Sequence, residues 1–504
     1  MNSKIIVFAT MSVGILVALF LGMAVGEGKR LEIVAVFGFM VGAPLLLALG
    51  KNYWYLIPAS LLSGLPAIPF GGRTINLSEV CIALCFGIFV TRLAFKRDKI
   101  ELARATSIPI YLFMAWVLFI FCLYPVSMAV FGAAMMGGRF YAQLALAFIA
   151  FLIIGSRTIT EKDVKWVLFF ILGGSIVNAT YSIASFLIFG AADDFLNAGT
   201  DTEGFYTWHQ SLGMPAVAIT FLLFAWKKPG EIIGFRNIPL ALLYLLCLGL
   251  ALYSGKRMAL VAVLITPILG AILHKQYSYI FLGGIAAILL SVTVMFGHGD
   301  VFRLPLQMQR ALSLLPANWD QEIKGIEGGS DPFRESLRRF AMENIKRDPI
   351  IGRGFGVQYS EIIGQIMATK YVGGGDSQAA PYAIGRAWHN TWLGYSADFG
   401  IPLAVIQALI YLTGLVVAYK AWFLCPARTP QKIFVGYMFL FIVRDLIASH
   451  TSGHTAMDAY DRWWMYGLLF SIYATLSAKK KGTTEYRPNE KELFMQRFST
   501  TANK

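Results

Sequence analysis

Apolar runs of about twenty residues recur along the whole chain, a length that crosses the ~30 Å hydrocarbon layer of a bilayer as a helix. A backbone exposed to lipid must satisfy its own hydrogen bonds, so these runs predict an all-α fold. Composition agrees, because 57% of the 504 residues are hydrophobic and 14% are charged, against about a quarter charged in soluble domains. The chain is therefore predicted to be a polytopic membrane protein.

The apolar runs predict about 12 to 14 transmembrane helices. We count a span near each of residues 5–25, 32–49, 53–69, 77–95, 108–131, 139–155, 165–190, 208–226, 238–254, 257–274, 277–297, 389–419, 432–449 and 462–478. The run at 53–69 is broken by Pro58, Gly64, Pro66 and Pro69, so a segment that only re-enters the membrane is the alternative there.

The net charge of +14 lies in short loops between the apolar runs and in a C-terminal tail. No basic stripe on a soluble domain accompanies it, so it indicates membrane topology and argues against a nucleic-acid partner. The basic loops at 96–104, 157–165 and 227–236 fall on the same side as the tail. The positive-inside rule then places both chain ends in the cytoplasm.

Domain organisation follows from this threading. We predict eleven spans in residues 1–297, a large periplasmic loop at 298–388, three spans in 389–478 and a basic cytoplasmic tail at 479–504. Within the long loop, apolar residues recur at helical spacing and predict an amphipathic helix that stops at Asp348-Pro349. These residues are Phe333, Leu337, Phe340, Ala341 and Ile345.

Three polar segments are candidates for chemistry at the predicted outer face. The first is the turn Tyr253-Ser254-Gly255-Lys256-Arg257 between two spans, where adjacent cations run against the positive-inside bias. Snorkelling of long basic side chains at a helix end is the structural alternative.

The second segment is the loop helix, where Arg334 and Arg338 lie four residues apart and can converge on one anion. A solvated helix face, with Glu335 and Glu343 offsetting the cations, is the alternative there.

Glycines follow the loop helix in Gly352-Arg353-Gly354-Phe355-Gly356, which only superficially resembles a nucleotide-binding loop. No Lys-Ser/Thr pair and no strand-to-helix setting accompany it, so we interpret these glycines as a backbone turn or a close approach to a ligand.

The third segment is Trp388-His389-Asn390-Thr391-Trp392-Leu393, which opens a long apolar helix and precedes Ala397-Asp398-Phe399-Gly400. His389 titrates near neutrality and can accept a proton from a hydroxyl. A structural histidine within an aromatic belt is the alternative.

Other polar groups receive weaker interpretations. His450, His454, Asp458 and Asp461 recur at helical spacing, for which polar lining of a cavity is favoured over a metal site. We expect no metal and no cofactor. Arg444-Asp445 inside a span is interpreted as a structural ion pair, and Trp208-His209-Gln210 as a vestibule lining or an interfacial anchor. All cysteines lie in or beside apolar segments, which predicts no structural disulfide. They are Cys81, Cys85, Cys122, Cys247 and Cys425.

The order of these segments resembles the O-antigen ligase and O-antigen polymerase superfamily. Members show a Ser-x-Arg-like turn between mid-chain spans, matched by Ser254 to Arg257. An Arg then precedes a Pro-hydrophobic-hydrophobic-Gly-x-Gly segment, matched by Arg334 and by Pro349 to Gly354. A His-Asn segment finally opens a helix, as at His389. The chain departs from the family pattern at Gln210, Arg338 and Arg353, which bears on the identity of the substrate.

The resemblance implies a GT-C-like glycosyltransferase of the bacterial inner membrane with a periplasmic active site. Members transfer a glycan from an undecaprenyl-diphosphate carrier to a sugar hydroxyl, with inversion and without metal or nucleotide sugar. It implies that Arg257 and Arg334 stabilise the leaving diphosphate, and that His389 orients or deprotonates the acceptor hydroxyl. Further binding residues for the diphosphate or glycan are Lys256, Arg338, Asn390, Gly354 and Gly356.

Alternatives stay open within and beyond this class. The long chain and loop favour a polymerase of O-antigen or exopolysaccharide units, whereas a ligase that transfers finished glycan to lipid A-core has the same donor site. A chain-length regulator or a flippase is a candidate partner. A lipid-linked oligosaccharide flippase or transporter predicts charges deep inside spans and repeat symmetry, whereas here the polar residues gather at one outer face and no internal repeat is seen. A membrane scaffold without chemistry leaves the Arg and His spacing unexplained.

Overall fold

The computed structural model describes ten stretches of the chain. They are residues 50–63, 68–70, 73–96, 98–100, 104–126, 138–189, 208–233, 237–356, 388–450 and 455–480. The spans expected at 5–25 and 32–49, and nearly all of the predicted tail, lie outside the described residues.

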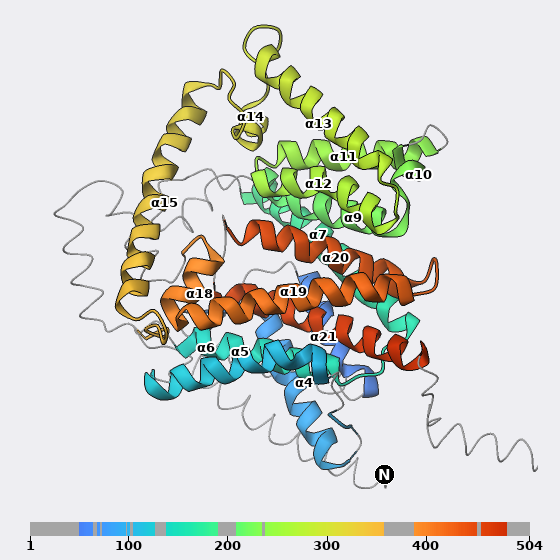
Figure 1. Ribbon diagram of the computed structural model, residues 1–504, viewed down its shortest axis with the longest axis vertical. Helices are drawn as coiled ribbons and strands as arrows, with labels where there is room; N and C mark the ends of the chain where they lie inside the picture. Colours follow the sequence, from blue (N-terminus) through green and yellow to red (C-terminus); the bar gives the residue numbers. More distant parts are fainter. Residues whose placement is uncertain are drawn as a thin grey trace, which may run out of the picture.

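Long helices form a bundle. In chain order the principal ones are α4 (Leu77–Ala94), α5 (Arg104–Leu123), α6 (Gly138–Gly155), α7 (Glu161–Phe189), α9 (Gly213–Trp226), α11 (Ile238–Tyr253), α12 (Arg257–Leu273), α13 (Ser278–Gly297), α19 (Ile401–Leu424), α20 (Pro430–Ala448) and α21 (Thr455–Lys480). Shorter elements are η1 (Gly50–Tyr55), α3 (Leu56–Ala59), η2 (Ser60–Ser63), η3 (Trp208–Leu212), α10 (Pro229–Ile233), α14 (Leu306–Leu312) and α18 (Thr391–Phe399). Helix α15 (Gln321–Arg347) runs along one side of the bundle, across the helix ends near α18 (Figure 1).

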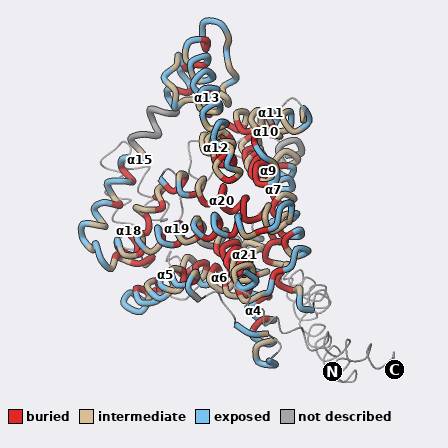
Figure 2. The backbone as a smooth tube through the Cα atoms, turned by 45° about the vertical axis from the view of Figure 1, so that its right-hand side comes forward, coloured by how far each residue is buried: buried red, intermediate tan, exposed pale blue. Residues whose placement is uncertain are grey.

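The length and hydropathy of the helices indicate an integral membrane protein. Among the described residues, six helices are long and apolar enough to cross a bilayer, and three shorter apolar helices accompany them. Helix α13 is the most exposed of the six, with Phe281, Ile288 and Phe296 between 64% and 75% exposed. Surfaces of this kind are stable only against lipid or another protein. Figure 2 shows buried residues concentrated in α9, α20 and α21 at the middle of the bundle.

Close helix packing forms the core around α6 and α21. A Cβ added at Gly467 of α21 would lie 2.8 Å from the Phe151 carbonyl oxygen and 3.1 Å from the Gly155 nitrogen of α6. Small residues that let helix backbones approach are typical of membrane bundles, where dispersion between helices replaces the hydrophobic effect as the driving force.

Two predicted spans are corrected by the structure. Residues 53–69 do not form one crossing helix: the helical run of η1, α3 and η2 ends at Ser63, and β1 (Ile68–Phe70) then pairs antiparallel with β2 (Arg73–Ile75). That run is shorter than the roughly 20 residues that a span needs. The expected helix at 389–419 is broken into α18 and α19 at Gly400, whose φ of 81° and ψ of 164° no helix contains. The helix predicted in the long loop is confirmed as α15, which ends at Arg347.

A buried ion pair fixes the connection after α4. Asp98 accepts from Arg157 Nη2 at 2.6 Å and from Arg92 Nε at 2.9 Å, and its side chain is 6% exposed. The Arg157 guanidinium also lies 4.9 Å from the centre of the Tyr53 ring. Burial raises the pKa of Asp98, but hydrogen bonds from Arg92 and Arg157 outweigh burial and lower it below its ordinary value.

Candidate functional site

The segment that carries His389 is attached to the C-terminal end of α20. The backbone N–H of Thr391 donates to the Ser449 carbonyl at 2.9 Å, and the Asn390 side-chain amide donates to the His450 carbonyl at 3.1 Å. The Asn390 side-chain oxygen also accepts from the Leu393 N–H at 3.0 Å, which makes Asn390 the N-cap of α18. Asn390 thus joins two helices and fixes the chain beside His389.

His389 itself has an unusual backbone, with φ at 51°. A non-glycine residue with positive φ is uncommon and persists where its surroundings hold it in place. On one side Asn390 caps α18; on the other, Trp388 is 4% exposed and its indole N–H donates to the Asp398 carboxylate at 3.3 Å. Asp398 is fully buried. These two anchors hold the backbone on both sides of His389.

Helix α15 packs beside this histidine. The Phe333 ring lies 5.9 Å from the His389 ring in an edge-on arrangement, and Leu337 and Ala341 of α15 form a buried cluster with Trp388. Arg334 directly follows Phe333, so its backbone lies one residue from this contact. Arg334 is exposed.

Arg338 lies one turn further along α15. Its guanidinium is 3.7 Å from the Glu335 carboxylate, and both side chains are more than 60% exposed. An exposed pair of this kind holds its partners only weakly. Arg338 is therefore available to an anionic ligand that approaches α15.

The glycine segment after α15 fits against the break between α18 and α19. The Ile401 N–H donates to the Pro349 carbonyl at 2.8 Å, and the Gly354 N–H donates to the Asp398 carbonyl at 2.6 Å. A Cβ at Gly352, where φ is 69°, would lie 2.5 Å from the Gly400 nitrogen. The two glycine-containing segments therefore satisfy each other's backbone groups where α18 ends.

Gly354 and Gly356, which we predicted to bind substrate, approach protein atoms in the structure. A Cβ at Gly354 would lie 2.7 Å from the Tyr141 hydroxyl, and one at Gly356 would lie 3.2 Å from Val126. Phe355 between them is fully buried. The segment thereby joins the end of α15 to the bundle core.

The turn before α12 carries the basic pair. Gly255 has a φ of 67°, and the buried Ser254 hydroxyl accepts from the Lys256 N–H at 3.2 Å and donates to the Ala251 carbonyl at 2.7 Å. The Lys256 side chain keeps contact with solvent, although protein surrounds it closely enough to lower the pKa of its ammonium by desolvation. The positive charges of Arg444 and Arg310 lower this pKa further.

Lys256, Arg310 and Arg444 thus bring three positive charges together from the α11–α12 turn, α14 and α20. Arg444 lies 3.6 Å from the Asp445 carboxylate, as predicted for a structural pair. Asp445 is 1% exposed and also pairs with Arg462 of α21 at 2.6 Å, while the Tyr411 hydroxyl donates to it at 3.1 Å. One buried carboxylate therefore serves two arginines, and the cluster retains excess positive charge.

Parts of the three predicted motifs approach the C-terminal end of α20. The charge of Arg444 on that helix acts on the Lys256 ammonium, and the two residues after His389 bond to Ser449 and His450. Phe333, which precedes Arg334, contacts the His389 ring. Sequence reasoning missed Arg310, because α14 lies outside the apolar pattern. It also missed the anchoring by Asp398, for which no local spacing is a signal.

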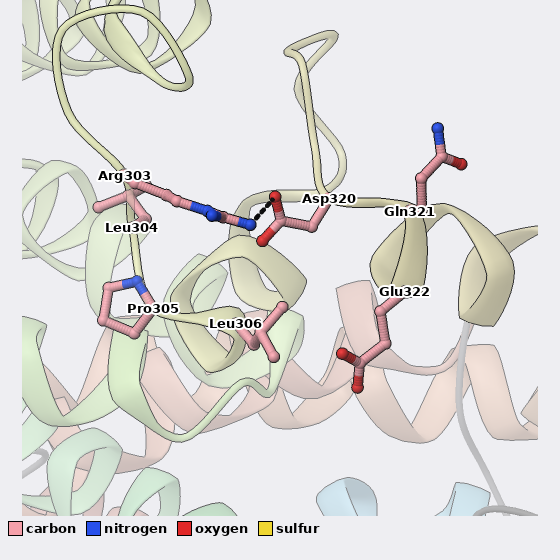
Figure 3. Close-up of a pocket in the computed structure, with 7 residues that line it drawn as sticks. All are labelled: Arg303, Leu304, Pro305, Leu306, Asp320, Gln321 and Glu322. Carbon is pink, nitrogen blue, oxygen red and sulfur yellow. Dashed lines mark hydrogen bonds and ion pairs between the residues drawn. The ribbon is translucent and has the colours of Figure 1, made fainter.

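A separate hollow lies between the end of α13 and the start of α15 (Figure 3). It measures about 660 Å³ and is lined by polar and charged side chains together with Leu304, Pro305 and Leu306, and Arg303 and Asp320 are paired at 2.8 Å. Asp320 also accepts from the Gln309 amide at 2.8 Å, which ties α14 to the start of α15. The candidate site residues do not line this hollow.

Metal ligands were considered at the end of α20. Among the described side chains, no group of three or more His, Cys, Asp or Glu residues has a geometry suited to a metal ion. His454 lies outside the described residues, and the side chains of Asp458 and Asp461 are not described either.

The fold and the cluster define a polytopic membrane protein that gathers cations, a histidine and an amide at one end of its helices. The sequence model of the O-antigen ligase family matches residues 242–408. This segment runs from α11 into α19 and includes Lys256, Arg257, Arg310, Arg334 and His389. The match supports the resemblance of the chain to the O-antigen ligase and polymerase superfamily. Among curated proteins no match was found.

Proposed function

We propose that this protein transfers a glycan from an undecaprenyl-diphosphate carrier to a sugar hydroxyl, with inversion and without a metal, at the periplasmic face of the inner membrane. Glycan transfer in surface polysaccharide assembly follows from the family. The mutual electrostatic effect of Lys256, Arg310 and Arg444, together with the attachment of the His389 segment to the end of α20, is the observation that supports the specific reaction.

The cations act on the leaving group. When the bond between the anomeric carbon and the diphosphate oxygen breaks, the electron pair remains on the diphosphate. Negative charge therefore concentrates where Lys256 and Arg257 begin α12 and where Arg310 adds a further charge. Cations that already repel one another gain from an anion placed between them, and more so as its charge grows in the transition state. Arg334 approaches from α15, and Arg338 of the same helix makes a weaker contribution.

His389 acts on the acceptor. Its neutral imidazole takes the proton from the acceptor hydroxyl as that oxygen bonds to the anomeric carbon, on the face opposite the departing diphosphate. One displacement of this kind inverts the configuration. Asn390 holds the segment in place, and we assign Gly354 and Gly356 to positioning α15 relative to α18.

The orientation is part of the proposal. The positive-inside rule puts residues 298–388 and the α18 end of the bundle in the periplasm, with both chain ends in the cytoplasm.

The acceptor distinguishes two versions of the reaction. The chain length and the long loop favour a polymerase that joins repeat units on the lipid carrier. The matched family is described as O-antigen ligase, which favours transfer of finished glycan to lipid A-core as the second candidate.

Purified protein incubated with an undecaprenyl-diphosphate glycan and each acceptor separates the two versions. Products that lengthen on the carrier support the polymerase, and labelled lipid A-core supports the ligase. No transfer to either acceptor, together with movement of the lipid-linked glycan across vesicles, would support a flippase and reject the proposal.

A further inference from the structure

A second cluster of cations lies at the opposite end of the bundle. The C-terminal ends of α9, α12 and α19 meet the start of α20 there, and Figure 1 shows α10 and the α19–α20 connection at the end away from α15 and α18. The Trp422 indole N–H donates to the Leu273 carbonyl at 2.9 Å, and the His274 ring contacts the Phe224 carbonyl at 3.0 Å. These bonds hold the helix ends around a cavity of about 310 Å³.

This cavity, here called the basic pocket, is lined by four cationic side chains and one carboxylate. The cations are Lys227, Lys228, Arg428 and Lys432, and the carboxylate is Glu231. Glu231 lies 3.6 Å from the Lys227 ammonium, a long and partly exposed pair. One acid against four bases leaves the pocket strongly positive.

Aromatic faces hold two of these ammonium groups at the pocket wall. Lys227 lies 4.6 Å from the centre of the Trp226 ring, and Lys432 lies 4.8 Å from the Trp422 ring. A cation–π contact directs a lysine without neutralising it. His274 in the same wall has its pKa lowered by burial and by the charges of Lys228 and Lys432, so it adds a neutral ring.

Topology and helix dipoles alone also bring lysine and arginine to helix C-termini. Such residues usually extend into water, whereas Lys227 and Lys432 are half-buried and line the same cavity as the exposed Lys228 and Arg428. Four cations and one carboxylate around one cavity point to a bound anion.

The surroundings indicate which anion. The pocket opens at the ends of membrane-spanning helices, where phospholipid phosphates lie, and large apolar side chains flank it. Trp226 in its wall is 50% exposed, and Phe423 next to Trp422 is 44% exposed. A cavity near the small end of the ligand-pocket range suits a headgroup rather than an oligosaccharide.

We propose that the basic pocket binds the phosphate of an anionic phospholipid headgroup. Lys227, Lys228, Arg428 and Lys432 surround the phosphate, and the flanking aromatic residues contact the acyl chains. The basic pocket includes the N-terminal end of α20, whereas the candidate functional site lies at the C-terminal end of that helix. The lipid proposal therefore does not depend on the proposed reaction.

Backbone geometry supplies a clean variant. Arg428→Gly removes a cation and relieves the positive φ, so it removes charge without a folding cost from strain. Lys432→Gln removes a second charge. Lys96→Gly is the matched control, because Lys96 is exposed, has a φ of 53° and is outside the pocket lining.

The test measures lipid binding to the full chain in detergent, by native mass spectrometry and by the shift of the thermal midpoint. Phosphatidylglycerol and cardiolipin should bind and raise the midpoint, and the R428G/K432Q double variant should bind at least tenfold more weakly than the K96G control. Phosphatidylcholine should bind weakly to all three proteins. Equal binding of phosphatidylglycerol to the double variant and the control would overturn the proposal. An equal shift from inorganic phosphate alone would overturn the assignment to a lipid.

Discussion

At Gly400, a single added methyl group should separate the segment Pro349 to Gly354 from the break between α18 and α19. Its φ of 81° and ψ of 164° lie in a region that only glycine populates readily, so an alanine there costs about 1–3 kcal/mol of backbone strain. The added Cβ would also overlap the carbonyl oxygen of Ile350, a backbone atom held by its neighbours. To relieve that overlap, Pro349 to Gly354 must move away from the α18–α19 break.

The movement gives the magnitude. It breaks the Ile401–Pro349 and Gly354–Asp398 hydrogen bonds, each worth about 1 kcal/mol net. Together with the strain, Gly400→Ala should destabilise the protein by about 3–5 kcal/mol. Because the same contacts hold α15 against α18, glycan transfer should fall along with stability.

The assay is thermal unfolding of the full chain in detergent, followed with glycan transfer on the same preparation. Gly249→Ala in α11 is the matched control, since a Cβ there meets nothing within 4 Å and should be neutral or stabilising by about 0.5–1 kcal/mol. A Gly400→Ala variant that melts and transfers glycan like the wild type would refute the role of this contact.

Three further predictions concern charges. Asp98→Asn leaves Arg92 and Arg157 without their carboxylate and should lower the free energy of unfolding by about 3–5 kcal/mol in thermal or denaturant unfolding. Because the folded-state pKa of Asp98 is lowered, its stabilisation is present above about pH 4 and is lost as the pH falls through the folded-state pKa. The Asp98→Asn variant should not show this loss. Arg462→Met removes the 2.6 Å partner of buried Asp445 and should destabilise the protein by about 3–5 kcal/mol. Arg462→Lys should keep part of that stability. An unchanged free energy of unfolding in Arg462→Met would contradict the buried pair. Lys256→Gln should raise the donor KM. Because the pKa of Lys256 is lowered, donor affinity of the wild type should weaken with rising pH already below the ordinary lysine pKa of about 10.4. A donor KM that does not change with pH would contradict a role for this charge.

Sequence periodicity predicted the helices whose apolar faces meet lipid or the core. The bounds of α12, α13 and α20 fall within two residues of the expected spans, because long apolar runs leave a helix few alternatives. It missed the break at Gly400, since the run from Ile401 onward is apolar and the conformation of Gly400 depends on contact with Pro349 to Gly352. The hairpin at β1 and β2 was missed for a similar reason, because short strands among prolines leave no clear period.

The candidate site was predictable only in part. Lys256, Arg257, Arg334 and His389 followed from motif order, but motif order carries no information on what orients them. Trp388 and Asp398, ten residues apart, meet only because the chain before α18 folds back along that helix. Arg310 joins Lys256 through the packing of α14 beside the α11–α12 turn, where a Cβ on Gly255 would lie 3.9 Å from Arg310.

The central claim is that cations around the α20 end and His389 carry out glycan transfer from a lipid diphosphate. The most direct measurement follows transfer of a labelled undecaprenyl-diphosphate glycan by the purified wild-type, His389→Ala and Arg257→Ala proteins in the presence of EDTA. The account predicts wild-type turnover that EDTA does not change, and a loss of roughly 10²-fold or more in each variant at unchanged thermal stability. Full turnover by either variant would contradict the assignment of that residue, and loss of wild-type turnover with EDTA would contradict transfer without a metal.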